Sequence, residues 1–358
     1  MQENEKHLDE AKKSTDGTAD SIDEYGKEVK EAEKDTSRFG DVLKASLASD
    51  LIIKGVKALG NSVKSLAKSS LGVGMDFESS MSLVAATMGI TTDEIDAGSE
   101  AFVALSDAAK EAGATTKFTS SEAAEALNYL ALAGYSAEKS ISALPTVLNL
   151  ASSGGLDLAY ASDLVTDSMS ALGMETDELD SFVDQLAKTS QESNTNIAQL
   201  GEGILTVGGT AKIMAGGTTE LSAQLGILAD NGIKGAEGGT ALRNVLLALS
   251  APTKKQSDQM KALGINTYDA NGQLRPTNEI FNDINDVLSN MTQQGQTEVL
   301  SKLFNKVDLK AANAMLANSG DRFNDLSGEI ANADGAAGEM AKTMEHNLKG
   351  QIQEFDSA

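Results

Sequence analysis

Apolar positions near the start of the chain repeat every seven residues. Between residues 8 and 39 the spacing alternates between three and four, which is the pattern of a coiled-coil seam. Threonine and alanine fill half of this seam, so a free helix remains the alternative. One line of the seam holds Leu8, Thr15, Ile22, Val29 and Thr36, and the other holds Ala11, Thr18, Tyr25, Ala32 and Phe39.

The register shifts after Gly40 and then resumes over a more apolar stretch. Its positions are Ile52, Val56, Leu59, Val63, Leu66, Ser70 and Val73, and the opposite face carries Lys54, Lys57, Lys64 and Lys68. A basic amphipathic helix can lie on an anionic membrane or dock on a partner. Because the register is heptad and the chain has no tryptophan, we expect self-association through Ile22, Val29, Ile52, Val56, Leu59, Val63 and Leu66.

From about Met75 the helical runs become short, with closely spaced start and stop signals. Thr91 with Glu94 and Thr119 with Glu122 have the spacing of capping boxes. Further expected caps are Ser136, Thr176, Thr195 and Thr218, and expected helix ends are Gly134, Gly154, Gly173, Gly209 and Gly232. The pattern predicts a bundle of short helices.

Two stretches within this bundle resemble each other. Residues 119–155 and 195–232 share the order of cap, helix, small-residue turn, helix and glycine stop. They predict a duplicated helical unit, with chance likeness among alanine- and leucine-rich helices as the alternative. Residues 265–276 alternate around Asp269 and Gly272 and predict a small β-hairpin.

These patterns predict an all-α protein in four parts. Residues 1–40 form a polar coiled-coil helix, 41–74 a basic amphipathic helix, 75–320 the helical core with its repeat and hairpin, and 321–358 a C-terminal helix that continues in a longer protein.

Composition excludes several classes of function. The 358 residues carry a net charge of −24 and no cysteine, so cysteine nucleophiles, disulfides and cysteine metal sites are absent. Residues 1–75 hold 12 basic and 14 acidic side chains, leaving 17 basic and 39 acidic in the remainder. Stable nucleic-acid binding by that remainder is not expected, because its surface repels phosphates. No run of 18 apolar residues predicts a membrane span.

The stretch DNGIKGAEGGTALRNVLLALSAP (230–252) has the outline of a phosphate-binding loop. A Walker-type loop requires a lysine where Gly239 stands, and Glu237 places a negative charge in the turn. We expect the glycines to allow close packing, with Thr240 capping the helix that follows. The nearby loop from Asp269 fails the EF-hand spacing, since its sixth position is Leu274.

Catalytic constellations are also weak. The two histidines, His7 and His346, lie at opposite ends of the chain. Clustered carboxyl groups could supply paired acids for glycoside hydrolysis, but first helical turns favour acidic side chains for capping. These groups are Asp93, Glu94, Asp96, Asp177, Glu178, Asp180 and Asp184. We expect neither an enzyme nor a bound metal or cofactor.

The segments LALAGYS (130–136), NGIKGAEGGTALR (231–243) and YDANGQLRP (268–276) are distinctive. With their surroundings, over residues 72–350, they resemble the core region of tail tape measure proteins of long-tailed bacteriophages. The residues that carry the resemblance are Gly134, Tyr135, Gly232, Gly235, Gly238, Gly239, Thr240, Arg243, Asp269 and Gly272.

The resemblance implies a structural protein that scaffolds assembly of the tail tube, helps set tail length and leaves the tail at infection. It implies partners in the tube protein and in assembly chaperones, and locations in the host cytoplasm and then the tail lumen. Complete tape measures are longer, so we expect this chain to be a fragment whose ruler segment lies elsewhere. The full-length protein can contact a membrane, although this chain has no transmembrane segment. The alternatives are a generic helical adaptor and, less favoured, a wall-degrading enzyme.

Overall fold

The computed structural model describes residues 74–346. The chain divides into two compact units, Met1–Asp76 and Phe77–Ala358, and the description that follows concerns the second. The predicted seam residues Ile22, Val29, Ile52, Val56, Leu59, Val63 and Leu66 lie outside the described residues.

All regular secondary structure within residues 74–346 is helical. A first helix covers residues 77–88 of this unit. The α-helices that follow are α4 (Thr92–Asp96), α5 (Glu100–Thr115), α6 (Ser120–Leu132), α7 (Ala137–Gly154), α8 (Leu158–Leu172), α9 (Leu179–Glu192), α10 (Ile197–Val207), α11 (Gly217–Asp230), α12 (Gly235–Ser250), α13 (Lys254–Leu263), α14 (Thr277–Ser289), α15 (Gln293–Leu303), α16 (Leu309–Ala317), α17 (Asp321–Ala331) and α18 (Ala336–Glu345). Short 3₁₀ helices are η1 (Thr176–Glu178), η2 (Gly208–Ile213) and η3 (Lys306–Asp308).

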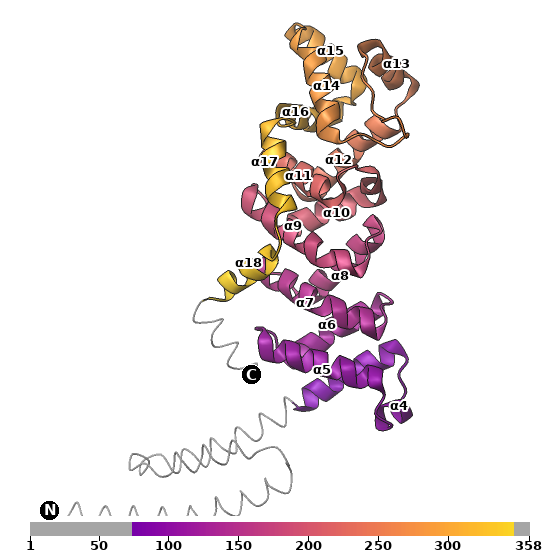
Figure 1. The fold of residues 1–358 in the computed structure, drawn as a ribbon, viewed down its shortest axis with the longest axis vertical. Coiled ribbons are helices and arrows are strands. Elements are labelled where there is room, and N and C mark those ends of the chain that lie inside the picture. Colours follow the sequence, from indigo (N-terminus) through magenta and orange to yellow (C-terminus); the bar gives the residue numbers. More distant parts are fainter. Residues whose placement is uncertain (1–73, 347–358) are drawn as a thin grey trace, which may run out of the picture. The chain divides into compact units, whose positions relative to one another are not determined.

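Helices of this unit stack on one another broadly in chain order (Figure 1). The stack runs from α4 and α5 at one end to α13, α14 and α15 at the other. Helix α6 packs on α5, α7 and α8, α8 packs on α10, and α10 packs on α12. The chain then reverses, and α17 and α18 run back along α11, α9 and α7. We call α17 and α18 the return segment.

The core is built from many small and medium side chains. Its largest fully buried residues include Phe182, Phe281 and Phe304, and the rings of the last two stack with centroids 5.9 Å apart. Helix α11 is buried on every side from Glu220 to Ala229 because α9, α12, α16 and α17 surround it. Alanine and glycine on the neighbouring helices permit this close approach.

Both predicted capping boxes are confirmed. Thr91 and Glu94 begin α4, and Thr119 and Glu122 begin α6, each pair with both reciprocal bonds. Ser136 caps α7 as expected, by accepting a hydrogen bond from the backbone N–H of Lys139. The other three expected caps are wrong, because the neighbouring residues Glu175, Asn196 and Gly216 occupy the N-cap positions.

Expected helix ends fall within one residue of the C-caps in the structure. Gly173 is the left-handed C-cap of α8, and Gly134 and Gly232 follow the C-caps of α6 and α11 with φ of 86° and 72°. Helix α7 ends at Gly154 as expected, with Gly155 as its left-handed C-cap. Helix α10 ends at Val207, with Gly208 as its C-cap, one residue before Gly209.

The predicted β-hairpin is not present as strands in the part of the chain that the structure describes. Residues 265–276 form one isolated antiparallel bridge, between Tyr268 and Leu274. Leu274 turns into the core, while the backbone N–H of Arg275 donates to the carbonyl oxygen of Thr267 at 2.9 Å. A two-stranded hairpin is only marginally stable without further strands beside it. The pairing therefore does not extend beyond this one bridge.

Candidate functional site

The glycine motif lies where α10 and α12 cross. A Cβ atom added at Gly239 would lie 2.2 Å from the carbonyl oxygen of Gly203 and 2.7 Å from Cβ of Thr206. The backbones of the two helices are therefore in contact, and only glycine fits at position 239. Across the same contact, a Cβ at Gly203 would lie 3.3 Å from the carbonyl oxygen of Gly235.

The turn that leads into α12 also depends on glycine. Gly232 and Gly235 have φ of 72° and 56°, values that L side chains rarely adopt. At Gly238 an added Cβ would lie 3.0 Å from the carbonyl oxygen of Ile233. Lys310 fastens the turn from outside, because its Nζ donates a hydrogen bond to the carbonyl oxygen of Gly232 at 3.1 Å. Together these contacts fix the angle at which α12 leaves α11.

Thr240 does not cap α12, contrary to the sequence-based prediction. The helix begins at Gly235, so Thr240 lies in its second turn. Glycines are weak helix formers in isolation, but the contact with α10 holds 235–239 in helical form. Arg243 completes the crossing, since its Nη1 donates to the carbonyl oxygen of Thr206 at 3.2 Å.

The electrostatics of this turn disfavour a nucleotide. The N-terminus of a helix attracts anions through its free N–H groups. At α12, however, a carboxyl oxygen of Glu202 lies 2.5 Å from where a Cβ of Gly235 would stand, and Glu237 lies in the first turn. These acidic side chains fill the space in which a phosphate would bind, and their negative charge would repel it.

The other two distinctive segments also take part in packing and turn formation. Gly134 makes the turn after α6, and the hydroxyl of Tyr135 donates to the sulfur of Met169 at 2.9 Å. Burial raises the pKa of Tyr135. In the loop after α13, Asp269 accepts hydrogen bonds from the backbone N–H groups of Gln273 at 2.8 Å and Asn271 at 2.9 Å.

These bonds stabilise the charged carboxyl group of Asp269. The bond from the Gln273 N–H is the largest cause of its lowered pKa. Gly272 follows with φ of 77°. The carboxyl group is therefore a turn-forming acceptor within its own loop.

Two buried carboxyl groups hold distant helices, and sequence reasoning missed both roles. Glu220, on α11, accepts hydrogen bonds at 2.6 Å from both the backbone N–H and the hydroxyl of Thr277, at the start of α14. Asp184, on α9, accepts from the backbone N–H groups of Gly335 at 2.8 Å and Ala337 at 2.9 Å, at the start of α18. Each carboxyl group acts as an N-cap supplied by another helix.

The environment of Asp184 combines opposing influences. Burial raises its pKa, the hydrogen bonds from Ala337 and Gly335 act against this, and Asp334 and Asp180 add to the rise. Asp180 itself accepts a hydrogen bond from the hydroxyl of Thr146. The carboxyl groups of Asp184 and Asp180 thus both accept hydrogen bonds from donors within the protein.

Other clustered carboxyl groups act at the starts of their own helices. Glu94 accepts from the backbone N–H of Thr91 at 2.8 Å, and this bond is the largest cause of its lowered pKa. Glu178 accepts from the backbone N–H of Glu175 at 2.8 Å. The capping role expected for the clusters at 93–96 and 177–184 is thus seen for Glu94 and Glu178.

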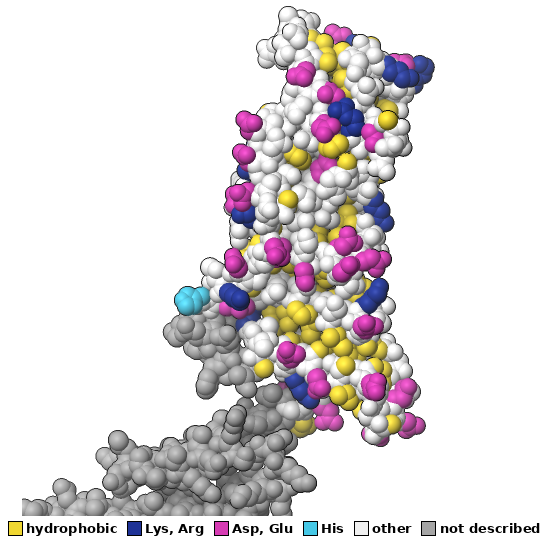
Figure 2. All heavy atoms as spheres, in the orientation of Figure 1, with side chains coloured by type: hydrophobic (Ala, Val, Ile, Leu, Met, Phe, Trp, Pro, Cys, Tyr) yellow, Lys and Arg dark blue, Asp and Glu magenta, His cyan; other side chains and the backbone are white. Residues whose placement is uncertain are grey.

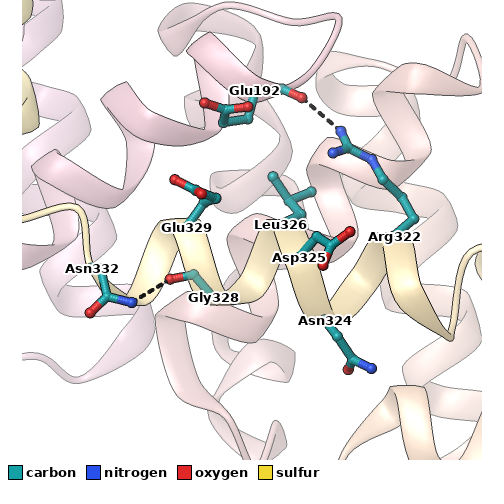
Figure 3. A pocket seen from close by; sticks show the side chains of 8 residues that line it. All are labelled: Glu192, Arg322, Asn324, Asp325, Leu326, Gly328, Glu329 and Asn332. Atoms are coloured by element: carbon teal, nitrogen blue, oxygen red, sulfur yellow. Dashed lines mark hydrogen bonds between the residues drawn. The ribbon is translucent and has the colours of Figure 1, made fainter.

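A shallow groove runs between the C-terminal end of α9 and α17 (Figure 3). Its lining is mostly polar: Glu192, Arg322, Asn324, Asp325, Leu326, Gly328, Glu329 and Asn332. Within residues 74–346, no group of three or more His, Cys, Asp or Glu side chains is placed to hold a metal ion. No helix of that range is both long and apolar enough to cross a membrane.

Comparison with known proteins places this arrangement in a family. Residues 106–305 match the family model of phage-related minor tail proteins. The chain is 32% identical over 292 residues to the tape measure protein of Pneumococcus phage Dp-1, and 27% identical over 288 residues to the probable tape measure protein of Escherichia phage P2. No solved structure gave a significant match.

The two alignments include 82% and 80% of this chain but only 25% and 35% of the respective relatives. The chain therefore spans about a quarter to a third of the length of these relatives. The family match covers more than half of the chain, including the glycine motif and most of the helical stack. The chain belongs to the family of phage tail tape measure proteins, within the phage-related minor tail proteins.

Proposed function

We propose that this chain is a structural segment of a tape measure protein that scaffolds assembly of the tail tube and helps set tail length. The observation that carries the proposal is the use of the distinctive motif: its glycines bring the backbones of α10 and α12 into contact. Because the motif serves helix packing, it supports a structural role for this segment as a folded unit. We propose no enzymatic activity for it.

The fold suggests which part of the protein would act as the ruler. A helix rises about 1.5 Å per residue, and the longest helix of the stack, α7, has 18 residues. The chain doubles back repeatedly, so most residues of this unit add little to an end-to-end length (Figure 1). We therefore assign length setting to extended helical segments outside residues 72–350.

Charge supports release ahead of the DNA. Residues 77–187 carry 18 acidic and only 3 basic side chains, and acidic groups are spread over the visible face (Figure 2). Such a surface repels a phosphate backbone. A protein that shares the tail channel with the genome would therefore not hold it there.

The proposed partners follow from the same role. Self-association through the N-terminal seam would bundle several copies, with the tube protein polymerising around them and assembly chaperones covering them beforehand. The proposed locations are the host cytoplasm during assembly and the tail lumen afterwards.

Tail lengths in the parent phage test the proposal. Blocks that preserve the heptad register would be deleted from the full gene outside residues 72–350, and tails would be measured by electron microscopy. We expect shortening by about 1.5 Å per deleted residue. Tails of unchanged length would contradict a tape measure role and favour the helical adaptor.

A further inference from the structure

We propose that the return segment can leave its own stack and bind the same site on a second copy of the chain. Two copies would then exchange α17 and α18. The inference goes beyond tail-length setting, and it rests on how the segment is held.

The apolar contacts of α17 form a cluster separate from the main core. Phe323, Leu326 and Ile330 pack against Ala223 and Ile227 of α11, and these five residues make up the whole cluster. The large core that joins the other helices does not include α17. Its departure would therefore leave the packing of that core in place.

The polar contacts of α17 lie at the surface, along the groove of Figure 3. Arg322 donates to Asp230 at 2.8 Å and to the carbonyl oxygen of Glu192 at 2.7 Å. Lys188 lies 3.0 Å from Glu329, whose side chain is 58% exposed. Surface ion pairs such as these contribute little to stability and re-form readily.

Helix α18 is held mainly through its first turn and its small side chains. Asp184 caps the N-terminus of α18, and the buried residues of the helix are Ala337 and Ala341. Each buries little more than a methyl group. Ala337 belongs to the main core, and Ala336 and the flexible side chain of Met340 pack against that core, so α18 is held by small or flexible side chains.

By contrast, the point where the return segment leaves the stack is fixed. Ser319, between α16 and α17, is buried and donates to Asn282 at 2.7 Å, while Asn285 donates to Ser319 at 3.2 Å. Helices α17 and α18 can thus swing away from the stack while Ser319 stays in place.

The site that it would vacate fits this segment closely. A Cβ added at Gly226 would lie 3.1 Å from Leu326 and 3.2 Å from Thr189, so α17 fits closely between α11 and α9. An uncovered α11 and an unpaired buried Asp184 would both be unfavourable. A second copy supplies the identical segment, which makes exchange a low-cost route to a dimer.

Zero-length crosslinking with mixed isotopes tests the proposal on the intact chain. Unlabelled and ¹⁵N-labelled protein would be unfolded together, refolded at high concentration and separated by size. A carbodiimide would then join Lys188 to Glu329, and mass spectrometry would read the isotopes of the linked peptides. In dimers, about half of these links should join a light to a heavy chain, as random pairing of two exchanged chains requires.

The pair Lys139 and Glu175, 4.0 Å apart within the stack, is the internal control, and its links should always join peptides of one isotope. Dimers formed through the N-terminal seam would give single-isotope links at both pairs. Single-isotope Lys188–Glu329 links in the dimer, or no dimer at all, would overturn the proposal.

A matched pair of variants tests what holds the segment. Folded light and heavy chains would be mixed without prior unfolding, and the Lys188–Glu329 links that join a light to a heavy chain would be counted after a fixed time. Arg322→Ala should raise their number by up to about fivefold over the parent, because the contacts with Asp230 and Glu192 are lost. Lys254→Ala removes an exposed pair with Asp258, away from the return segment, and should leave exchange unchanged. Equal exchange in the two variants would count against the mechanism.

Discussion

Replacing Gly239 by alanine tests the packing role of the glycine motif. The new Cβ would lie 2.2 Å from the carbonyl oxygen of Gly203, a backbone atom that cannot rotate away. Restoring an ordinary contact requires α10 and α12 to separate by about 1 Å, and overpacking of this kind costs about 1–3 kcal/mol. The better helix propensity of alanine returns roughly 0.5–1 kcal/mol. We expect a net loss of about 1–2 kcal/mol.

Gly328→Ala is the matched control. Gly328 lies inside α17, and nothing stands within 4 Å of where its Cβ would be. Alanine there should stabilise the helix by about 0.5–1 kcal/mol. At about 2–4 °C per kcal/mol for a unit of this size, the two variants should differ in Tm by roughly 3–12 °C. Thermal unfolding followed by circular dichroism at 222 nm measures this. Equal Tm values would refute the close contact of α10 with α12.

Three further results are expected. Glu220→Ala should lower the free energy of unfolding by about 2–4 kcal/mol, measured in urea, because the buried N–H and hydroxyl of Thr277 lose their acceptor; an unchanged midpoint would show that this cap is dispensable. Because the pKa of Asp269 is lowered in the folded protein, its charged form stabilises the fold above about pH 4, and this contribution is lost as pH falls through the folded pKa. Asp269→Asn should therefore weaken the dependence of Tm on pH below about pH 4. A fall in Tm with acid as steep as that of the parent would argue against this role. Millimolar Mg-ATP should leave Tm unchanged, because the carboxyl group of Glu202, on α10, lies beside the start of α12 and Glu237 lies in its first turn; a concentration-dependent rise in Tm would instead support nucleotide binding.

The capping boxes could be predicted because both members of each pair lie within one helical turn, whereas the lone threonines Thr176, Thr195 and Thr218 gave caps one or two residues off. Thr119 and Glu122 are three residues apart, and their reciprocal bonds form within that turn. Glycine stops were placed within one residue for the same reason. The all-helical class follows from these signals together with the short apolar runs.

Contacts between distant segments could not be read in this way. Thr240 was expected to begin α12, yet the helix starts five residues earlier because α10 supports Gly235–Gly239 from the side. Asp184 was assigned to the first turn of its own helix, whereas its hydrogen-bond donors lie 151 and 153 residues away. Nothing in the local sequence distinguishes an acid that caps its own helix from one that caps another.

The loop at 265–276 shows a third kind of departure. Its turn residues were identified correctly, since Asp269 accepts from the loop backbone and Gly272 has a positive φ. Alternation predicted two strands, but the buried Leu274 packs on helices and pairing stops after one bridge. Turn chemistry is local, whereas the extent of a strand depends on its neighbours.

Introducing Gly239→Leu into the parent phage tests the central claim most directly, namely that the motif builds a fold needed for tail assembly. Leucine would force α10 and α12 apart far more than alanine. With Gly328→Ala as the matched control, electron microscopy would count tails and measure their lengths. The account predicts far fewer tails in the Gly239→Leu phage, with parental length in those that form, and parental numbers in the control. Parental numbers of normal tails in the Gly239→Leu phage would contradict it.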